Sequence, residues 1–224
     1  MTTDTGKEPL GIIPHGLPLK FGKAAEDYAQ MIGGVIWASN YLHGSFFYLF
    51  NALLEPTHSG PVARALWLSY SIGDAAARRA TRDLASSKLA PESGILLDIN
   101  WSVRLADRLG EIRNDFVHTP VDFDSGTAAV VPDRFASTDA RKKRLARPDI
   151  AEIALAVRDD LFRLSCFVWR LSLEVSKPQT KPLEPPILRC LALLGDDRKL
   201  SIPPDPTARR HLRLSFQKEP EVKG

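Results

Sequence analysis

The sequence predicts an all-α fold, a four- to five-helix bundle, and three observations lead to this prediction. Apolar residues recur at helical spacing in long segments that glycine and proline interrupt. No β-α-β alternation and no glycine-rich phosphate loop is present, since Gly33 and Gly34 lack a flanking strand pattern. The 224 residues, 44% hydrophobic and 25% charged, suit one medium domain that can bury a core without disulfides or a structural metal.

Four long helices are expected, separated by clear breaks. They cover about residues 21–54, 61–86, 91–117 and 150–176. Pro61 is well placed as the first residue of the second helix, and Asp149 is a suitable N-cap for the fourth. The connection at residues 119–148 is rich in turn residues, and its part at 121–131 has the pattern of a small β-hairpin.

Charge and proline content divide the chain into an N-terminal arm (1–20), a helical bundle (21–176) and a Pro-rich tail (177–224). The net charge is only +3, and the tail holds ten basic and six acidic side chains with eight of the 17 prolines. This composition favours an extended, solvated arm that packs as a strap, stays unpacked, or contacts RNA or a partner. Its apolar stretch at 187–194 predicts one or two docked helical turns.

The two cysteines, Cys166 and Cys190, match no metal-ligand spacing, and the sequence has no Cys/His cluster. We therefore expect no metal site and no cofactor. Two lone thiols indicate a reducing compartment. Residues 1–20 lack the basic start and apolar run of a secretory signal. The expected location is cytoplasmic.

Residues 28–54 contain no Asp, Glu, Lys or Arg and are long enough to span a bilayer. Amides and the imidazole of His43 interrupt this run, and they would be costly in hydrocarbon. A central helix of a bundle therefore explains the run better than a membrane span. The helix carries more apolar surface than a lone four-helix bundle can hide, which predicts a homodimer. His43 is expected to be a buried, hydrogen-bonded core residue.

The third predicted helix has an apolar stripe and a polar stripe. The apolar stripe consists of Trp101, Leu105, Leu109, Ile112 and Phe116. The polar stripe consists of Asp107, Glu111, Asn114 and His118. Pro120 disfavours helical geometry at the residue before it, so the helix should end near His118. Arg113, Asn114 and His118 then present a cation, an amide and an imidazole at a helix end, which suits an anion-handling site.

Residues 111–118 read EIRNDFVH. This string resembles the R-x(4–6)-H signature of the HEPN superfamily, in its form R-N-x-x-apolar-H. Arg113, Asn114 and His118 match the Arg, the polar residue after it and the His. The resemblance implies a bundle of four or five helices and, in many members, a metal-independent endoribonuclease that serves as a toxin, a phage-defence effector or an RNA-processing enzyme. It also implies a dimer in which two motifs face each other across one composite cleft.

RNA carries its own nucleophile, the 2′-hydroxyl, so cleavage needs two proton transfers and a stabilised phosphorane. An imidazole with a free pKa of about 6.5 can perform either transfer, and His118 is the expected general base or acid. Arg113 is expected to clamp the phosphate with its planar fork. Asn114 would orient the phosphate or His118, and Asp115 would hold the imidazole. No metal is required, and the expected products carry 2′,3′-cyclic phosphate and 5′-hydroxyl ends.

The chain departs from one form of the family. Some members carry a tyrosine two residues after the His, where a partner antitoxin attaches a nucleotide. Here that position is Pro120, so regulation by a nucleotidyltransferase is not expected. An antitoxin or regulatory protein of another kind stays open as a partner.

Substrate binding needs positive charge near the motif. The loop after the third helix supplies Arg141, Lys142, Lys143, Arg144 and Arg147. These five cations are the expected RNA contacts, with a solvated loop as the alternative. A second basic group on the second helix consists of Arg78, Arg79 and Arg82. For that group, solvated charge on a helix face is the favoured interpretation.

Two further functions are compatible with the sequence. The first is a non-catalytic helical module that dimerises or binds partner proteins through its uncharged first helix and its tail. The second is a membrane-associated helical protein. An open groove at Arg113 and His118 would favour the ribonuclease, and a salt bridge at Arg113 or a buried His118 would favour the interaction module.

Overall fold

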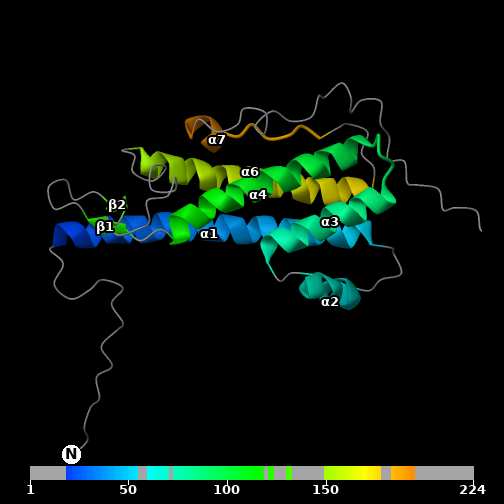
Figure 1. The fold of residues 1–224 in the computed structure, drawn as a ribbon, viewed down its shortest axis with the longest axis horizontal. Helices are drawn as coiled ribbons and strands as arrows, with labels where there is room; N and C mark the ends of the chain where they lie inside the picture. Colours follow the sequence, from blue (N-terminus) through cyan, green and yellow to red (C-terminus); the bar gives the residue numbers. More distant parts are fainter. Residues whose placement is uncertain are drawn as a thin grey trace, which may run out of the picture.

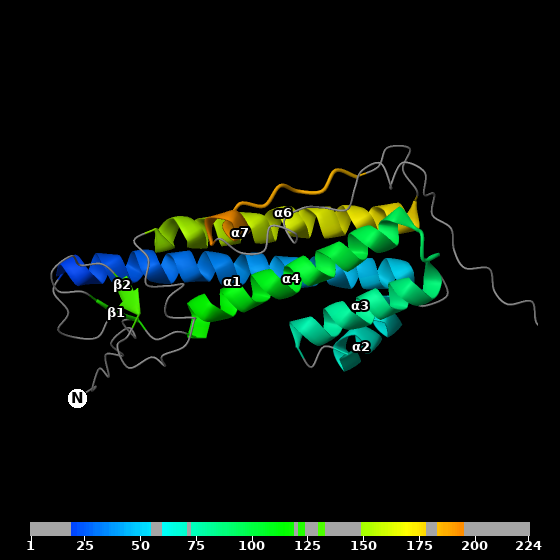
Figure 2. The ribbon, with the colours of Figure 1, turned by 45° about the horizontal axis from the view of Figure 1, so that its top comes forward.

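Four long helices form the body of the molecule. They are α1 (Leu19–Leu53), α3 (Asp74–Lys88), α4 (Gly94–His118) and α6 (Ile150–Ser176). The short helices are α2 (Gly60–Tyr70) and α7 (Cys190–Leu193). The computed structural model describes residues 19–54, 60–70, 73–118, 121–123, 130–132, 149–177 and 183–194. Helices α1, α4 and α6 run side by side, with α3 against them and α2 at the edge (Figures 1 and 2). The predicted all-α class is confirmed.

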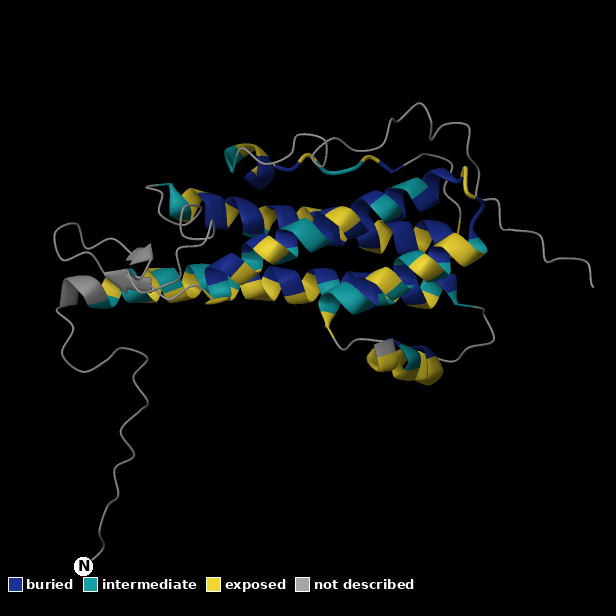
Figure 3. Cartoon of the chain, in the orientation of Figure 1, coloured by how far each residue is buried: buried dark blue, intermediate teal, exposed yellow. Residues whose placement is uncertain are grey.

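Helices α1 and α6 make the largest helix–helix contact in the described part of the chain. Their facing surfaces carry apolar residues every three or four positions, which places those residues on one side of each helix. On α1 these buried residues include Val35, Leu42, Phe46 and Leu49. On α6 they include Val157, Leu161, Leu164, Val168 and Leu171. The buried side chains follow the inner faces of the bundle in Figure 3.

The uncharged part of α1 packs within the bundle along one side. The hydroxyl groups of Ser45 and Ser165 lie 2.7 Å apart and join α1 to α6 by a buried hydrogen bond. Ser45 also donates to the carbonyl of Tyr41, one turn earlier. Across the described ranges, no helix has both the length and the apolar character that a membrane crossing requires.

Helix α4 crosses α1 and α6 obliquely (Figure 2) and buries the predicted apolar stripe. All five residues of that stripe, from Trp101 to Phe116, are at most 2% exposed, which confirms the prediction. The Trp101 ring meets the edge of Phe167 of α6, with centroids 5.7 Å apart and planes at 89°. Such edge-to-face pairs add to the stabilisation from area burial alone.

The expected single helix over residues 61–86 is wrong, because the structure has two helices there. Helix α2 ends at Tyr70 and α3 begins at Asp74. Gly73 between them is extended, with φ 169° and ψ 156°, and its carbonyl accepts from the amides of Ala76 and Ala77. Asp74 lies in the first turn of α3, where a carboxylate is stabilised by the helix dipole. Gly73 followed by an acid therefore restarts the helix.

The expected β-hairpin is present as two strands in the connection after α4. Strand β1 (Val121–Phe123) pairs antiparallel with β2 (Val130–Pro132), and Asp122 is opposite Val131. The pair lies beside the first turns of α1 (Figure 1). The residues between the two strands, 124–129, lie outside the described residues.

Helix α6 has the predicted bounds, but its predicted cap is wrong in detail. Asp149 occupies the N-cap position, and its side chain makes no capping hydrogen bond. The expected docked turn in the tail is present as α7, which packs on α6. Buried Asp160 of α6 accepts hydrogen bonds from the amides of Arg189 and Cys190, each at 2.7 Å. Asp160 thus fixes the segment 183–194 as a strap along α6.

Replacing Asp160 with alanine should release this strap. The change removes both acceptors and leaves two amides unsatisfied, so α7 should detach. Burial, together with the Asp160 carboxylate, raises the pKa of the Cys190 thiol, which keeps it unreactive. Mass spectrometry after brief alkylation should therefore find Cys190 unmodified in wild type and modified in Asp160→Ala. Protection of Cys190 in Asp160→Ala would contradict the role of this carboxylate.

Candidate active site

The three motif residues lie in the last two turns of α4. The helix ends at His118, as Pro120 predicts. The hydroxyl of Tyr28, from α1, donates to the carbonyl of Phe116 at 3.3 Å. This carbonyl is among the last four of α4, which have no partner within the helix. Burial raises the pKa of Tyr28, so its hydroxyl stays protonated and can donate. The end of α4 is therefore held against α1.

Arg113 forms hydrogen bonds to two side chains. Its Nη2 donates to Oδ2 of Asp74 in α3 at 3.1 Å, and its Nη1 donates to the amide oxygen of Asn114 at 2.8 Å. The Arg113 side chain is 23% exposed. Its Nε is buried and has no hydrogen-bond partner among the described residues. The guanidinium is thus fixed in orientation, and an adjacent carboxylate offsets its charge.

Asp74 also contacts the imidazole of a histidine. Its Oδ1 lies 3.3 Å from Nδ1 of His43 in α1, which is ion-pair distance, although the ring N–H is not aligned for a hydrogen bond. The other ring nitrogen of His43 accepts from the indole N–H of Trp67, in α2, at 3.3 Å. We call His43, Trp67, Asp74 and Arg113 the polar cluster, because these residues connect α1, α2, α3 and α4.

The contacts of His43 determine which nitrogen of the neutral ring carries the proton. Because Nε2 accepts from Trp67, the proton is on Nδ1, the ring nitrogen that lies 3.3 Å from Asp74. His43 is therefore hydrogen-bonded as expected, but it is partly exposed, at 30%, instead of buried. Its position at the edge of α1, between α2 and α3, explains the difference.

His118 differs from Arg113 in being exposed. No described residue holds its imidazole by a hydrogen bond or an ion pair. Arg113 and His118 are five positions apart, so on an ideal helix their side chains point about 140° apart. Asn114 and His118 are one turn apart and share a face. The structure therefore brings Arg113 to Asp74 and Asn114, and it leaves His118 available at the helix end.

The remaining polar residues of the motif helix are largely engaged. Asp107 accepts from Arg78 of α3 at 2.8 Å, and Glu111 pairs with Arg108. Asp115, which we expected to hold the imidazole, is buried, whereas His118 is exposed.

The two basic groups have different outcomes. In the group on α3, Arg78 is buried in its ion pair and Arg82 pairs with Asp83. The interpretation as solvated charge is therefore wrong for Arg78, which α4 covers, and fits Arg82, which is partly exposed. The expected RNA contacts Arg141, Lys142, Lys143, Arg144 and Arg147 lie outside the described residues.

Sequence patterns did not predict the polar cluster. Asp74 and Arg113 are 39 positions apart, and His43 and Trp67 are 24 apart, so only the packing of four helices brings them together. One local feature indicated that Asp74 begins a helix, because it is an acidic residue directly after a helix-breaking glycine.

Within the described ranges, no group of three or more His, Cys, Asp or Glu side chains could hold a metal ion. No protein-family model, no curated protein and no solved structure matches this chain. The residues themselves therefore carry the functional argument.

Proposed function

We propose that the protein is a metal-independent endoribonuclease of HEPN type whose reacting groups are His118 and Arg113. The observation that carries this proposal is the exposed imidazole at the end of α4, close in sequence to a guanidinium that Asp74 and Asn114 hold in place. An exposed histidine that no described residue holds contributes little to folding. A planar cation on the same helix is the kind of group that binds a scissile phosphate.

His118 would remove the 2′-hydroxyl proton or protonate the leaving 5′-oxygen. The 2′-oxygen then attacks phosphorus, the bond to the 5′-oxygen breaks, and a 2′,3′-cyclic phosphate and a 5′-hydroxyl result. In the dimer that the resemblance implies, two copies of His118 would divide the two proton transfers between them.

Asp74 does not prevent Arg113 from binding phosphate. A guanidinium has five N–H donors, and two of them are used by Asp74 and Asn114. The remaining N–H groups on Nη1 and Nη2 are the proposed donors to a phosphate oxygen, because Nε is buried. The carboxylate lowers the net charge of the site, so binding of RNA would depend on further cations. Arg141 to Arg144 and Arg147 are the proposed source of these cations.

RNA cleavage by the full chain should survive an excess of EDTA. The proposed chemistry uses only side chains, and end analysis should find 2′,3′-cyclic phosphates and 5′-hydroxyls. Cleavage that stops with EDTA and returns with Mg²⁺ or Mn²⁺ would point to other residues. If the chain cuts no RNA with or without added metal, the ribonuclease proposal fails.

A second candidate function is a non-catalytic interaction module. The observation that favours it is the Arg113–Asp74 ion pair, which ties α4 to α3 as a structural salt bridge would. In that case Arg113→Ala should lower the melting temperature, and no RNA cleavage should be found. In the ribonuclease, Arg113→Ala should lower cleavage far more than stability, and Arg113→Lys should rescue only part of the loss, because an ammonium lacks the fork.

We place the proposed ribonuclease in the cytoplasm, with a role in defence or as a toxin. The two cysteines support this location, since both are free, and free thiols suit a reducing compartment. The role follows from the family resemblance.

A further inference from the structure

Helices α1 and α6 expose a continuous apolar surface, which we call the aromatic face. Its largest members are Trp37, Tyr41 and Tyr48 of α1 and Trp169 of α6, which are 58%, 57%, 55% and 46% exposed. Leu155 and Leu173 of α6 are also exposed. The positions on each helix are spaced by three, four or seven residues, or multiples of these, so they lie along one side of it. A monomer rarely leaves so many large apolar side chains together on its surface.

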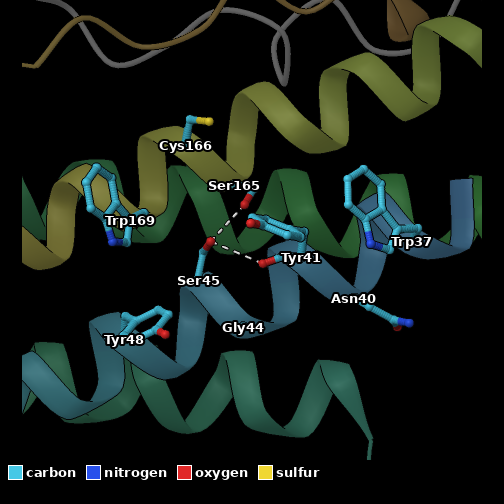
Figure 4. Close-up of a pocket in the computed structure, with 9 residues that line it drawn as sticks. All are labelled: Trp37, Asn40, Tyr41, Gly44, Ser45, Tyr48, Ser165, Cys166 and Trp169. Carbon is cyan, nitrogen blue, oxygen red and sulfur yellow. Dashed lines mark hydrogen bonds between the residues drawn. The ribbon is translucent and has the colours of Figure 1, made fainter. Parts of the chain in front are cut away.

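A groove of about 660 Å³ lies in the middle of the aromatic face. Figure 4 shows it between α1 and α6, with the Ser45–Ser165 hydrogen bond at its base. The groove is lined by Trp37, Asn40, Tyr41, Gly44, Ser45, Tyr48, Ser165, Cys166 and Trp169. Trp37 is held in place by the edge of Phe162, with centroids 4.8 Å apart. The groove therefore has fixed aromatic walls and no charged lining residue.

The aromatic face lies on the side of the α1–α6 layer away from α4. In Figure 4, the groove opens toward the viewer and α4 passes behind α1 and α6. Helix α4 packs on the other side of these two helices, where it buries its apolar stripe. The aromatic face and the motif residues Arg113 and His118 thus belong to opposite sides of the layer.

We propose that the aromatic face is the interface with a second copy of this chain, related by a two-fold axis through the groove. The groove lining is uncharged, and Arg158, between Leu155 and Phe162 on α6, is paired with Asp159. A two-fold axis through the groove therefore brings no like charges together there and leaves no charge unpaired in the groove. Tryptophan and tyrosine dominate the binding energy of many interfaces, and both are present here. The hydroxyls of Tyr41 and Tyr48 and the amide of Asn40 supply polar groups for the rim.

The aromatic side chains supply part of the area that a stable dimer buries. Trp and Tyr side chains present about 150–250 Å² each, so four that are half exposed provide on the order of 400 Å² per copy. This is about half of the ~800 Å² that each partner buries in an interface of standard size. The exposed leucines and the partly buried Phe162 extend the same surface.

Other occupants fit the face less well. RNA needs cations along its backbone, and the groove lining has none. Helices that lie in a membrane surface are rich in Lys and Arg around their apolar side. Helix α1 carries no charge from residue 28 to its end, and Arg158 on the α6 side of the face is already paired with Asp159. A second copy of this chain needs no cations in the groove or around it.

Gly44 gives this interface a sensitive position. It lies in the groove beside Tyr41, Ser45 and Tyr48, and a Cβ added to it would have no atom within 4 Å. In the dimer, the aromatic side chains of one copy would fill this space in the other. A larger residue at Gly44 would therefore block the dimer without disturbing the monomer.

This interface has a consequence for the proposed ribonuclease. With the aromatic faces together, the two copies of His118 lie on the outer sides of the dimer and do not meet. The composite cleft implied by the family resemblance would then need contact through the α4 ends. The assembly proposed here stands independently of catalysis, and its test uses molecular mass alone.

Sedimentation velocity on the full chain and two variants tests the proposal. Wild type should sediment as a dimer at micromolar concentrations and remain so at high salt, since the contact is apolar. Gly44→Glu should sediment as a monomer, because it places two like charges in the apolar groove. Its melting temperature at low concentration should equal or exceed that of wild type, because glutamate is a better helix former than glycine. The matched control Leu68→Glu adds the same charge on α2, at an exposed site outside the face, and should stay dimeric.

Three results would overturn the proposal. The first is a wild-type monomer across the concentration range. The second is a Gly44→Glu variant that dimerises as well as wild type. The third is a wild-type monomer that binds neutral phosphatidylcholine vesicles in a Trp37-dependent manner, which would assign the face to a lipid surface.

Discussion

Replacing His118 with alanine is expected to lower RNA cleavage by about 10²–10⁴-fold, the usual loss on removing a general acid or base. The same change should leave the melting temperature within a degree or two of wild type, because an exposed residue at a helix end contributes little to the core. Single-turnover cleavage with saturating enzyme measures the chemical step without the contribution of binding. Thermal unfolding of the same samples reports on the fold.

Arg104→Ala is the matched control for this experiment. Arg104 is an exposed residue of α4, 14 positions before His118 and therefore about 20 Å away along the helix. It should leave both cleavage and stability unchanged. If His118→Ala cuts RNA as fast as wild type, the motif is not the active site. If it melts far below wild type, His118 has a structural role in place of a catalytic one.

Replacing Trp101 with alanine should cost about 3–5 kcal/mol of unfolding free energy, the range for truncating a large buried aromatic residue. Trp101 is fully buried where α4 meets α6, and the loss includes its contact with Phe167. Domains have total stabilities of about 5–15 kcal/mol, so the variant should be close to unfolding at room temperature. Urea unfolding followed by circular dichroism gives the free energy.

Leu68→Ala tests whether this cost comes from burial. Leu68 is 64% exposed on α2, and its truncation should change the stability by less than about 0.5 kcal/mol. A loss below about 1 kcal/mol for Trp101→Ala would show that the core around α4 relaxes to fill the space.

Sequence patterns predicted the long helices well where the apolar spacing and the helix-breaking residues agreed. The stripe from Trp101 to Phe116 follows from helical spacing alone, and Pro120 marks the end of that helix. The break at Gly73 was missed because apolar spacing continues across it from α2 into α3. A single glycine costs only about 1 kcal/mol in a helix, so the sequence alone could not decide between one helix and two.

The sequence suggested the members of the candidate site but not their contacts. The spacing of Arg113 and His118 made both residues candidates, and the helix end explains why His118 is exposed. The partner of Arg113 could not be predicted, because the position of Asp74 depends on how α3 packs on α4. The same limit applies to Asp160, whose acceptance of two amides from the strap has no local sequence signal.

The hydrogen bond from Tyr28 to Phe116 affects how shortened forms of this protein should be interpreted. The donor, the Tyr28 hydroxyl, lies nearly ninety positions earlier in the chain than the carbonyl that it binds. That carbonyl is two residues before His118. A fragment that starts after residue 28 would retain the whole motif and lose the group that secures its last turn. Inactivity of such a fragment would therefore report a loosened helix end, and it would not bear on the chemistry of the motif. Tyr28→Phe is the cleaner probe, since it removes the donor and retains the ring.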